Sequence, residues 1–431
     1  MAKKTKAADL SIEEKLEQAL VVPGYEPYKI PDNWCWTNLK TVCNLDNGIK
    51  HNNESLVYFD AKTLREITEP VSRNSGVIVE KGQKVILVDG ENSGEVFVIP
   101  DRGYMGSTFR ILNISKHFDE MYIRYFIDIF REELKKNKIG SAIPHLNKEL
   151  FYGLQFPLPP LPEQQRIVER IESLFSKLDE AKEKAQEAID SFETRKAAIL
   201  HKAFSGELTA KWREENGVGI DEYPVYRFSE VAEIKSNLVD PAEYQDYPHI
   251  APDNIEKKTG VLLDYHTIRE DGVTSGKHRF YPGQILYSKI RPNLSKLVIV
   301  DFDGLCSADM YPIEAKGDTK CLCYYMLSEE FLEQASSAGS RSVLPKINQK
   351  ELSALRIRMP SSIDEQKEIS RLLDSLIEKE YQSKQVAESV IDQIDAMKKA
   401  ILARAFRGEL GTNDPEEESA VELLKQILSG E

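Results

Sequence analysis

The chain has 431 residues, of which 41% are hydrophobic, 30% charged and 9% aromatic. This balance indicates a folded protein of two to four domains and excludes collagen-like, low-complexity and disordered classes. The longest aliphatic runs are four-residue segments such as Val85–Val88, whereas a membrane-spanning helix needs roughly 20 apolar residues. The net charge is −14. Half of this charge lies in residues 361–431, which contain 16 acidic and 9 basic residues. Because the rest of the chain is closer to neutral, the net charge does not exclude a nucleic-acid partner.

Residues 1–22 are predicted to form an N-terminal arm. The arm is basic at its start but lacks the apolar run of a secretion signal, and Ser11–Leu20 has the pattern of a short amphipathic helix. The five cysteines are sparse, and the pair Cys321 and Cys323 has no second pair at zinc-binding spacing. We therefore expect free thiols, a reducing compartment and a cytoplasmic protein.

Residues 23–160 and 211–360 are predicted to be two α/β domains. Each contains short apolar runs bounded by turn residues, which indicate strands, followed by a helical pattern. The strand-rich stretches are Gly76–Gly103 and His278–Gly304, and the helical patterns cover Met121–Asn137 and Cys321–Ala335. The two segments resemble each other only weakly.

A strong internal repeat follows each of these domains. Residues 163–208 match residues 365–410 without a gap, and 19 of the 46 aligned positions are identical. The two halves of the chain are therefore copies of one unit. Since the domains have diverged while these segments have not, the pattern suggests one common task and two different targets.

Residues 161–210 and 361–410 are predicted to be long helices, because apolar residues alternate at spacings of three and four. Prolines precede both helices, and Gly206 and Gly408 follow them. Arg195 breaks the first apolar seam, and Glu380 and Ser383 break the second. The helix-pairing residues that we predict are Ile167, Ile171, Leu174, Leu178, Phe192, Ile199, Ile369, Leu373, Leu376, Val390, Ile394 and Ile401.

The simplest partner for each helix is the other copy, in an antiparallel coiled coil. The alternative is that each helix caps its own domain. Residues 411–431 are predicted to be an acidic tail with a short helix at Val421–Leu428. The expected fold is therefore α+β, with two pseudo-repeated α/β domains separated by two long antiparallel coiled-coil helices.

Catalytic patterns are weak throughout the sequence. The Pro-Pro pair in Pro157–Pro162 lacks the aromatic residue of a methyltransferase loop, and Gly272–His278 departs from a phosphate-binding loop in both spacing and its last residue. Asp253 and Glu256 lie too close together for a nuclease-type carboxylate pair. We therefore expect a chain without a catalytic or metal site of its own.

A DNA-binding surface is the remaining interpretation. Residues 275–300 contain no acidic residue but three lysines and two arginines, which suit phosphates and base edges. Each such residue could also be ordinary solvated surface. The candidates are Arg73, Asn74, Ser75, Lys84, Asn92, Ser93, Arg110 and His145 in the first domain, and Lys277, Arg279, Tyr287, Lys289, Arg291, Asn293, Lys296, Arg341 and Lys346 in the second.

The segments Pro157–Phe175 (PLPPLPEQQRIVERIESLF) and Arg195–Thr209 (RKAAILHKAFSGELT), repeated in degenerate form, resemble the specificity subunit of type I restriction–modification systems. Pro31–Leu39 and Gly283–Lys296 are similar to segments of its target-recognition domains. The resemblance implies double-stranded DNA as one partner, with each domain reading one half of a split target. It also implies two methyltransferase subunits docked on the helices, with S-adenosylmethionine bound there, and a restriction subunit where one exists. A two-headed coiled-coil scaffold that binds other proteins is the alternative function.

Overall fold

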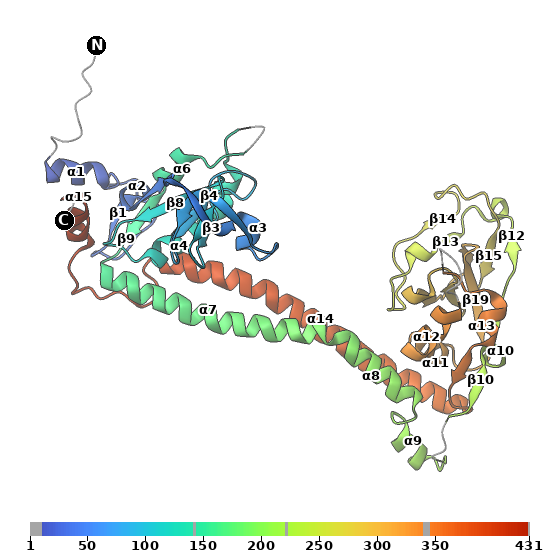
Figure 1. Ribbon diagram of the computed structural model, residues 1–431. Coiled ribbons are helices and arrows are strands. Elements are labelled where there is room, and N and C mark those ends of the chain that lie inside the picture. Colours follow the sequence, from blue (N-terminus) through green and yellow to red (C-terminus); the bar gives the residue numbers. More distant parts are fainter. Residues whose placement is uncertain (1–10, 141–143, 220–222, 339–344, 430–431) are drawn as a thin grey trace. The chain divides into compact units, whose positions relative to one another are not determined.

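The computed structural model describes residues 11–140, 144–219, 223–338 and 345–429 (Figure 1). The chain divides into two compact units: residues 1–184 with 390–431, and residues 185–389. Unit 1 thus unites both ends of the chain, because residues that follow the second long helix return to the first domain. The predicted domains are consecutive segments of the chain, so they do not include this grouping of the C-terminal residues with the first domain.

Unit 1 contains the first α/β domain, the start of α7 and the end of α14. Its elements are α1 (Ile12–Ala19), β1 (Cys35–Asn38), α2 (Leu39–Val42), β2 (Cys43–Asp46), β3 (Lys50–Phe59), α3 (Ala61–Leu64), β4 (Val71–Val79), β5 (Lys84–Leu87), β6 (Val96–Val98), β7 (Gly103–Met105), β8 (Phe109–Ile114), α4 (Glu120–Ile129), α5 (Arg131–Lys136), α6 (Lys148–Gly153), β9 (Gln155–Leu158), α7 (Leu161–Asp190), α14 (Ile363–Ala405) and α15 (Ala420–Ser429).

Three groups of strands form the first domain. An antiparallel sheet has the order β2-β8-β5-β6, and β1 pairs with β9. The strands β3, β4 and β7 pair with one another in a closed arrangement, with β3 parallel to β7. The residues that connect Phe59 to Val71 include α3, so the long β3–β4 pair is not a tight hairpin.

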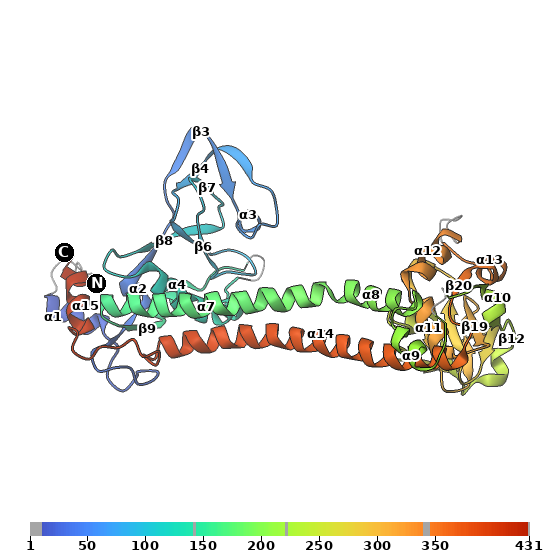
Figure 2. The same ribbon diagram turned by 90° about the horizontal axis from the view of Figure 1, so that it is seen from below.

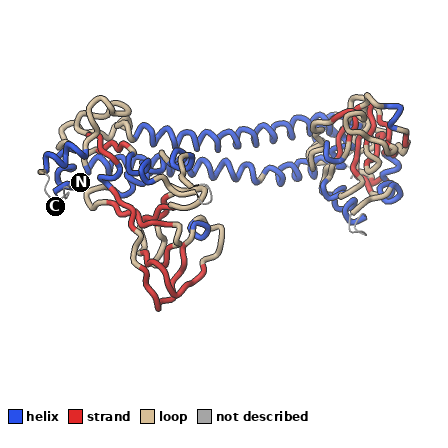
Figure 3. The backbone as a smooth tube through the Cα atoms, turned by 90° about the horizontal axis from the view of Figure 1, so that it is seen from above, coloured by secondary structure: helices blue, strands red, loops and turns tan. Residues whose placement is uncertain are grey.

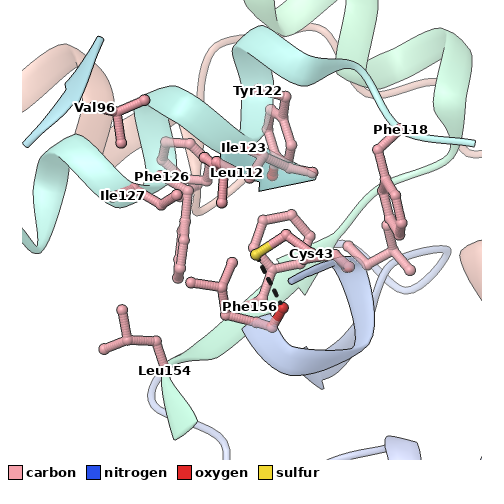
Figure 4. Packing of buried hydrophobic residues seen from close by; sticks show 14 of the residues in the cluster. Cys43, Val96, Leu112, Phe118, Tyr122, Ile123, Phe126, Ile127, Leu154 and Phe156 are labelled. Carbon is pink, nitrogen blue, oxygen red and sulfur yellow. Dashed lines mark hydrogen bonds between the residues drawn. The ribbon is translucent and has the colours of Figure 1, made fainter. Parts of the chain in front are cut away.

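The core of unit 1 is aromatic and includes parts of both long helices. Phe126 and Phe156 meet edge to face, with ring centroids 4.9 Å apart (Figure 4). Phe406, just beyond α14, lies 5.4 Å from Phe126, and Ile167 and Ile171 of α7 belong to the same buried cluster. Burial of these side chains therefore anchors one end of each long helix in the domain.

Unit 2 contains the second α/β domain with the adjoining helices. Its elements are α8 (Phe192–Phe204), α9 (Ala210–Glu215), β10 (Val225–Arg227), α10 (Phe228–Val231), β11 (Ala232–Ile234), β12 (Leu238–Val239), η1 (Pro241–Tyr244), β13 (Pro248–Ile250), η2 (Pro252–Asn254), β14 (His266–Thr267), β15 (Lys277–Phe280), β16 (Ile285–Ser288), η3 (Pro292–Leu294), β17 (Leu297–Ile299), β18 (Gly304–Cys306), β19 (Met310–Ala315), α11 (Thr319–Met326), α12 (Glu329–Ala338), α13 (Gln349–Ala354) and β20 (Arg356–Arg358).

Part of the topology of the first domain recurs in the second. Its sheet β11-β19-β16-β17 has the connectivity of β2-β8-β5-β6, and β13 is parallel to β18 as β3 is to β7. Gly82 and Gly283 occupy the third position of the turns that lead into the equivalent strands β5 and β16, with positive φ of 84° and 85°. The weak resemblance between the two domain sequences therefore conceals a shared fold.

The long helices are antiparallel within each unit. In unit 1, where Figure 2 shows α7 beside α14, Asp179 and Lys182 of α7 pair with Lys398 and Asp395 of α14. In unit 2, Arg195 of α8 pairs with Glu380, so residue numbers again rise along one helix as they fall along its partner. Every predicted helix-pairing residue is buried or half-buried. Ile167, Ile171, Ile369 and Leu373 lie in the domain cores, so the helices that pair with each other also pack against their domains at these positions.

The first long helix is interrupted, contrary to the single helix predicted for residues 161–210. α7 ends at Asp190 and α8 begins at Phe192. At the break, Ser191 Oγ donates to the carbonyl of Glu187 at 2.7 Å, and Arg195 Nη2 donates to that of Ala188 at 3.1 Å. Such side-chain bonds compete with the helical backbone pattern and bend a helix.

The predicted terminal helices are both present, as α1 and α15, and they contact each other. All five cysteines are buried and unpaired. Within the described ranges, no helix is long and apolar enough to span a membrane.

Candidate nucleic-acid interface

In the first domain, three of the predicted residues share one exposed strand. Arg73, Asn74 and Ser75 lie in the first half of β4, and all three are exposed. The Arg73 guanidinium stacks over the ring of Tyr58, with its carbon 3.4 Å from the ring centroid. The stacked arginine is held in place while its N–H donors stay accessible.

The other candidates of the first domain are mostly engaged within the fold. Lys84 pairs with Glu120, and Arg110 Nη1 donates to the carbonyls of Ser107 and Phe109. Ser93 is completely buried and donates to the carbonyl of Gly90 at 2.7 Å, so it cannot contact DNA as predicted. Asn92 is half-buried beside it.

His145 closes a junction between two loops. Its Nδ1 lies 2.6 Å from Asp89 Oδ1, while half of the side chain is exposed. The amide of Gly90 donates to the carbonyl of Pro144, and that of Leu146 donates to the carbonyl of Val88, both at 2.7 Å. This junction leaves His145 on the surface next to the β5–β6 loop.

In the second domain, two candidates are buried, and the prediction for them is wrong. Tyr287 is 1% exposed within β16, whose four residues are all buried, so it belongs to the core. Lys277 is 7% exposed, and its Nζ donates to Ser275 Oγ at 2.8 Å. Burial lowers the pKa of Lys277.

Arg279 lies among three tyrosine rings. Its guanidinium carbon is 4.9 Å from the centroid of Tyr281, 5.4 Å from that of Tyr244 and 5.8 Å from that of Tyr247. The Oδ1 atom of Asp303 lies 3.8 Å from Nη2 of the same arginine. The arginine therefore holds three loops of its own domain together.

The lysines of the second domain bind neighbouring oxygens. Lys289 donates to the carbonyl of Ala308, and burial lowers its pKa. Lys296 Nζ donates to the carbonyl of Pro252 at 2.7 Å, and Lys346 Nζ donates to Asp309 Oδ1 at 3.0 Å. Only about half of the Lys346 side chain is exposed, and the two other lysines are largely covered.

Arg291 and Asn293 remain exposed, on the turn between β16 and β17. Arg291 has φ 47° and ψ 60°, the left-handed region that side-chain-bearing residues seldom adopt. Its amide donates to the carbonyl of Pro345, and the amide of Ile347 donates to that of Lys289. This junction is the counterpart of the one at Gly90 and His145. Arg341 lies outside the described residues.

The sequence interpretation missed a second polar segment beside Arg73. The first half of β3 is exposed throughout and consists of Lys50, His51, Asn52, Asn53, Glu54 and Ser55. Their mixed charge gave no basic run, and only their pairing with β4 shows that they share a surface with Arg73 and Asn74. Trp34 and Trp36 are buried in the first domain.

Comparisons with known proteins agree with this architecture. The family model described as "Type I restriction modification DNA specificity domain" matches residues 31–190 and again residues 220–389. The type I restriction enzyme EcoDI specificity subunit of Escherichia coli is 37% identical over 325 residues, which are 69% of this chain and 73% of that protein. The HsdS subunit from Thermoanaerobacter tengcongensis shares the fold with a TM-score of 0.58 at 18% identity, over 89% of this chain and 99% of that one. A chain solved in a study of complex assembly and conformational transition of the type I R-M system gives a TM-score of 0.66 at 19% identity, covering 89% of this chain and all of that one.

Proposed function

The chain belongs to the type I restriction–modification specificity subunits, which recognise DNA sequences, and we propose that each of its two domains reads one half of a gapped DNA target. The observation that carries this proposal is the repetition of one scaffold with two different exposed surfaces. The first domain presents Arg73 and Asn74 on a strand, whereas the second presents Arg291 and Asn293 on a turn. Two surfaces of different residues suit two different half-sites.

In this proposal the paired helices dock two methyltransferase subunits. The first turns of α7 and α14 have matching contacts, which supports two equivalent docking sites. Glu163, in the first turn of α7, accepts hydrogen bonds from Trp34 Nε1 at 2.7 Å and Asn413 Nδ2 at 2.8 Å. Glu365 takes the same place in α14 and accepts from Thr209 Oγ1 and the Tyr223 hydroxyl, both at 2.7 Å. Each glutamate thus fastens the segment that follows the other long helix.

Catalysis belongs to the docked subunits. They bind S-adenosylmethionine and methylate adenine after turning the base out of the duplex. This chain supplies recognition and spacing. A restriction subunit joins the same complex where the genome encodes one.

Single-molecule mapping of methylated adenine tests the proposal. DNA is taken from cells that express this chain together with the methyltransferase encoded beside it, and cells with the methyltransferase alone are the control. We expect a gapped, two-part methylated motif that requires this chain. If the two proteins co-purify folded and no new motif appears, the chain is a protein-binding scaffold instead.

A further inference from the structure

The first domain carries an exposed region on two paired strands, here called the outer ribbon: residues 50–55 of β3 and 71–75 of β4, which lie opposite each other at Asn52 and Ser75. Every one of its residues is exposed. Val57 and Val77, which lie opposite Ser72 and Lys50 but outside the ribbon, pack against the buried cluster of the domain. Figures 2 and 3 show these strands at the end of the domain away from α7. The ribbon therefore adds no core to the fold.

The outer ribbon is nevertheless held in a defined shape. The β3–β4 register shifts between Asn52 and Leu56, and Asn53 adopts a φ of 76° in this bulge. The Tyr104 hydroxyl donates to the carbonyl of Glu54 at 3.0 Å, and Arg102 Nη2 donates to Glu54 Oε2 at 3.1 Å. Bulges of this kind re-aim side chains at functional sites. The only carboxylate on the ribbon is thereby neutralised.

The side chains of the ribbon match the edges of base pairs. Asparagine pairs with the N6 and N7 atoms of adenine, and arginine with the O6 and N7 atoms of guanine. The ribbon holds Asn52, Asn53, Asn74 and Arg73, together with Lys50 and His51 and without a free acid. A two-stranded ribbon also fits the width of the major groove.

We propose that the outer ribbon enters the major groove of the first half-site and that its asparagines read adenine there. The inference rests on the proposed function and specifies how one half-site is read. Within its described residues the second domain offers no equivalent ribbon, because its corresponding strands β12 and β15 pair at only two positions, Leu238 with His278 and Val239 with Lys277. The two domains thus read DNA with different elements.

The test uses the full chain with its methyltransferase and three variants, Asn52→Ala, Asn74→Ala and Asn113→Ala. Asn113 is the matched control, an exposed asparagine on β8 outside the ribbon. We expect each ribbon variant to lose about tenfold discrimination for adenine at one position of the first half-site, with the second half-site unchanged. The control keeps the wild-type motif.

Two outcomes would overturn the inference. One is that both ribbon variants give the wild-type motif. The other is that their methylation rate falls by the same factor on all DNA sequences, which is the effect expected from the loss of a phosphate contact. Co-purification with the methyltransferase and an unchanged melting temperature show that each variant is folded. If the wild-type chain itself gives no gapped motif, the proposed function fails, and that result is distinct from failure of the ribbon.

Discussion

Arg291 holds a backbone conformation that suits glycine. The equivalent residue of the first domain is Gly90, which has a φ of 105° and makes the same amide contact with the neighbouring proline-containing loop. A left-handed residue with a side chain costs about 1 kcal/mol. Since the Arg291 side chain is exposed, the arginine is kept at this cost for a reason other than packing.

The variant Arg291→Gly separates recognition from stability. We expect the melting temperature to stay the same or rise, because glycine relieves the strain, while recognition of the second half-site weakens. Methylation mapping and thermal unfolding of the same preparation measure the two effects. Weakening at both half-sites would contradict the assignment of Arg291 to one domain. Lys289→Ala, in contrast, should lower stability, since Lys289 donates to the carbonyl of Ala308.

Glu163 is fully buried, and this burial raises the pKa of its carboxyl above the ordinary value of 4.5. A raised pKa means that the folded chain binds this proton more tightly than the unfolded chain. The contribution of Glu163 to stability is therefore greatest at low pH, and it declines as the pH rises from 4.5 through the folded-state pKa.

Substitution of Glu163 tests whether its contribution to stability declines as the pH rises. Glu163→Gln keeps an acceptor for Trp34 and Asn413 and should remove this part of the pH dependence. Glu163→Ala leaves both donors without their acceptor and should cost about 2 kcal/mol. Denaturant unfolding followed by tryptophan fluorescence between pH 4.5 and 7.5 measures both effects. Glu172→Gln, an exposed position on the same helix, is the control. An unchanged pH slope in Glu163→Gln would refute the interpretation.

At the scale of elements, the charged residues that interrupt the two apolar seams form an ion pair with each other. Arg195 breaks the first seam and Glu380 the second, and in unit 2 Arg195 Nε donates to Glu380 Oε2 at 2.7 Å. The ring of Phe192 lies 5.0 Å from that of Tyr381 beside this pair. The side chains are 37% and 22% exposed, so solvent weakens the ion pair without cancelling it.

The double variant Arg195→Leu/Glu380→Leu should be at least as stable as the wild type, because it completes the apolar seam. Each single variant leaves one charge against that seam and should lose about 1 kcal/mol. A double-mutant cycle from denaturant unfolding gives the coupling energy. Additive single effects would show that the two charges do not interact.

The long helices were predictable from sequence because the two copies of the helical repeat share many identical residues. The two domains share a backbone topology but few identical residues. Gly103 and Gly304 survive in both domains because a Cβ atom there would lie 2.4 Å from the ring of Phe59 or 2.3 Å from that of Phe280. Most other core positions accept any apolar residue of suitable size. The common topology was therefore hidden from sequence comparison.

The candidate site was only partly predictable for a related reason. A basic stretch such as residues 275–300 shows which charges are present but not which ones the fold engages. Lys277 and Tyr287 lie on strands that are covered on both faces, so the alternation that marks an outward side chain is missing. The exposed residues of β3 carried no charge signal, and only three-dimensional pairing places them beside Arg73.

At the scale of the whole molecule, helix length is the quantity that can set the gap between half-sites. α14 has 43 residues, which at 1.5 Å per residue corresponds to about 64 Å. A heptad of each helix is about 10 Å long, close to the rise of three base pairs. The two helices can be shortened together without leaving a charge unpaired, because Asp179 and Lys182 pair with Lys398 and Asp395.

Deletion of residues 178–184 together with residues 393–399 removes both ion pairs whole and keeps the seven-residue register of the seams. We expect the gap in the methylated motif to shorten by about three base pairs while both half-site sequences stay the same. The methylation rate should also fall, since three base pairs turn the half-sites by about 100° around the DNA axis, whereas a heptad turns the helices by only about 20°. Duplication of the same two segments is the matched control and should lengthen the gap by the same amount. A gap that stays constant in both variants, with methyltransferase binding intact, would mean that the helices do not act as the ruler.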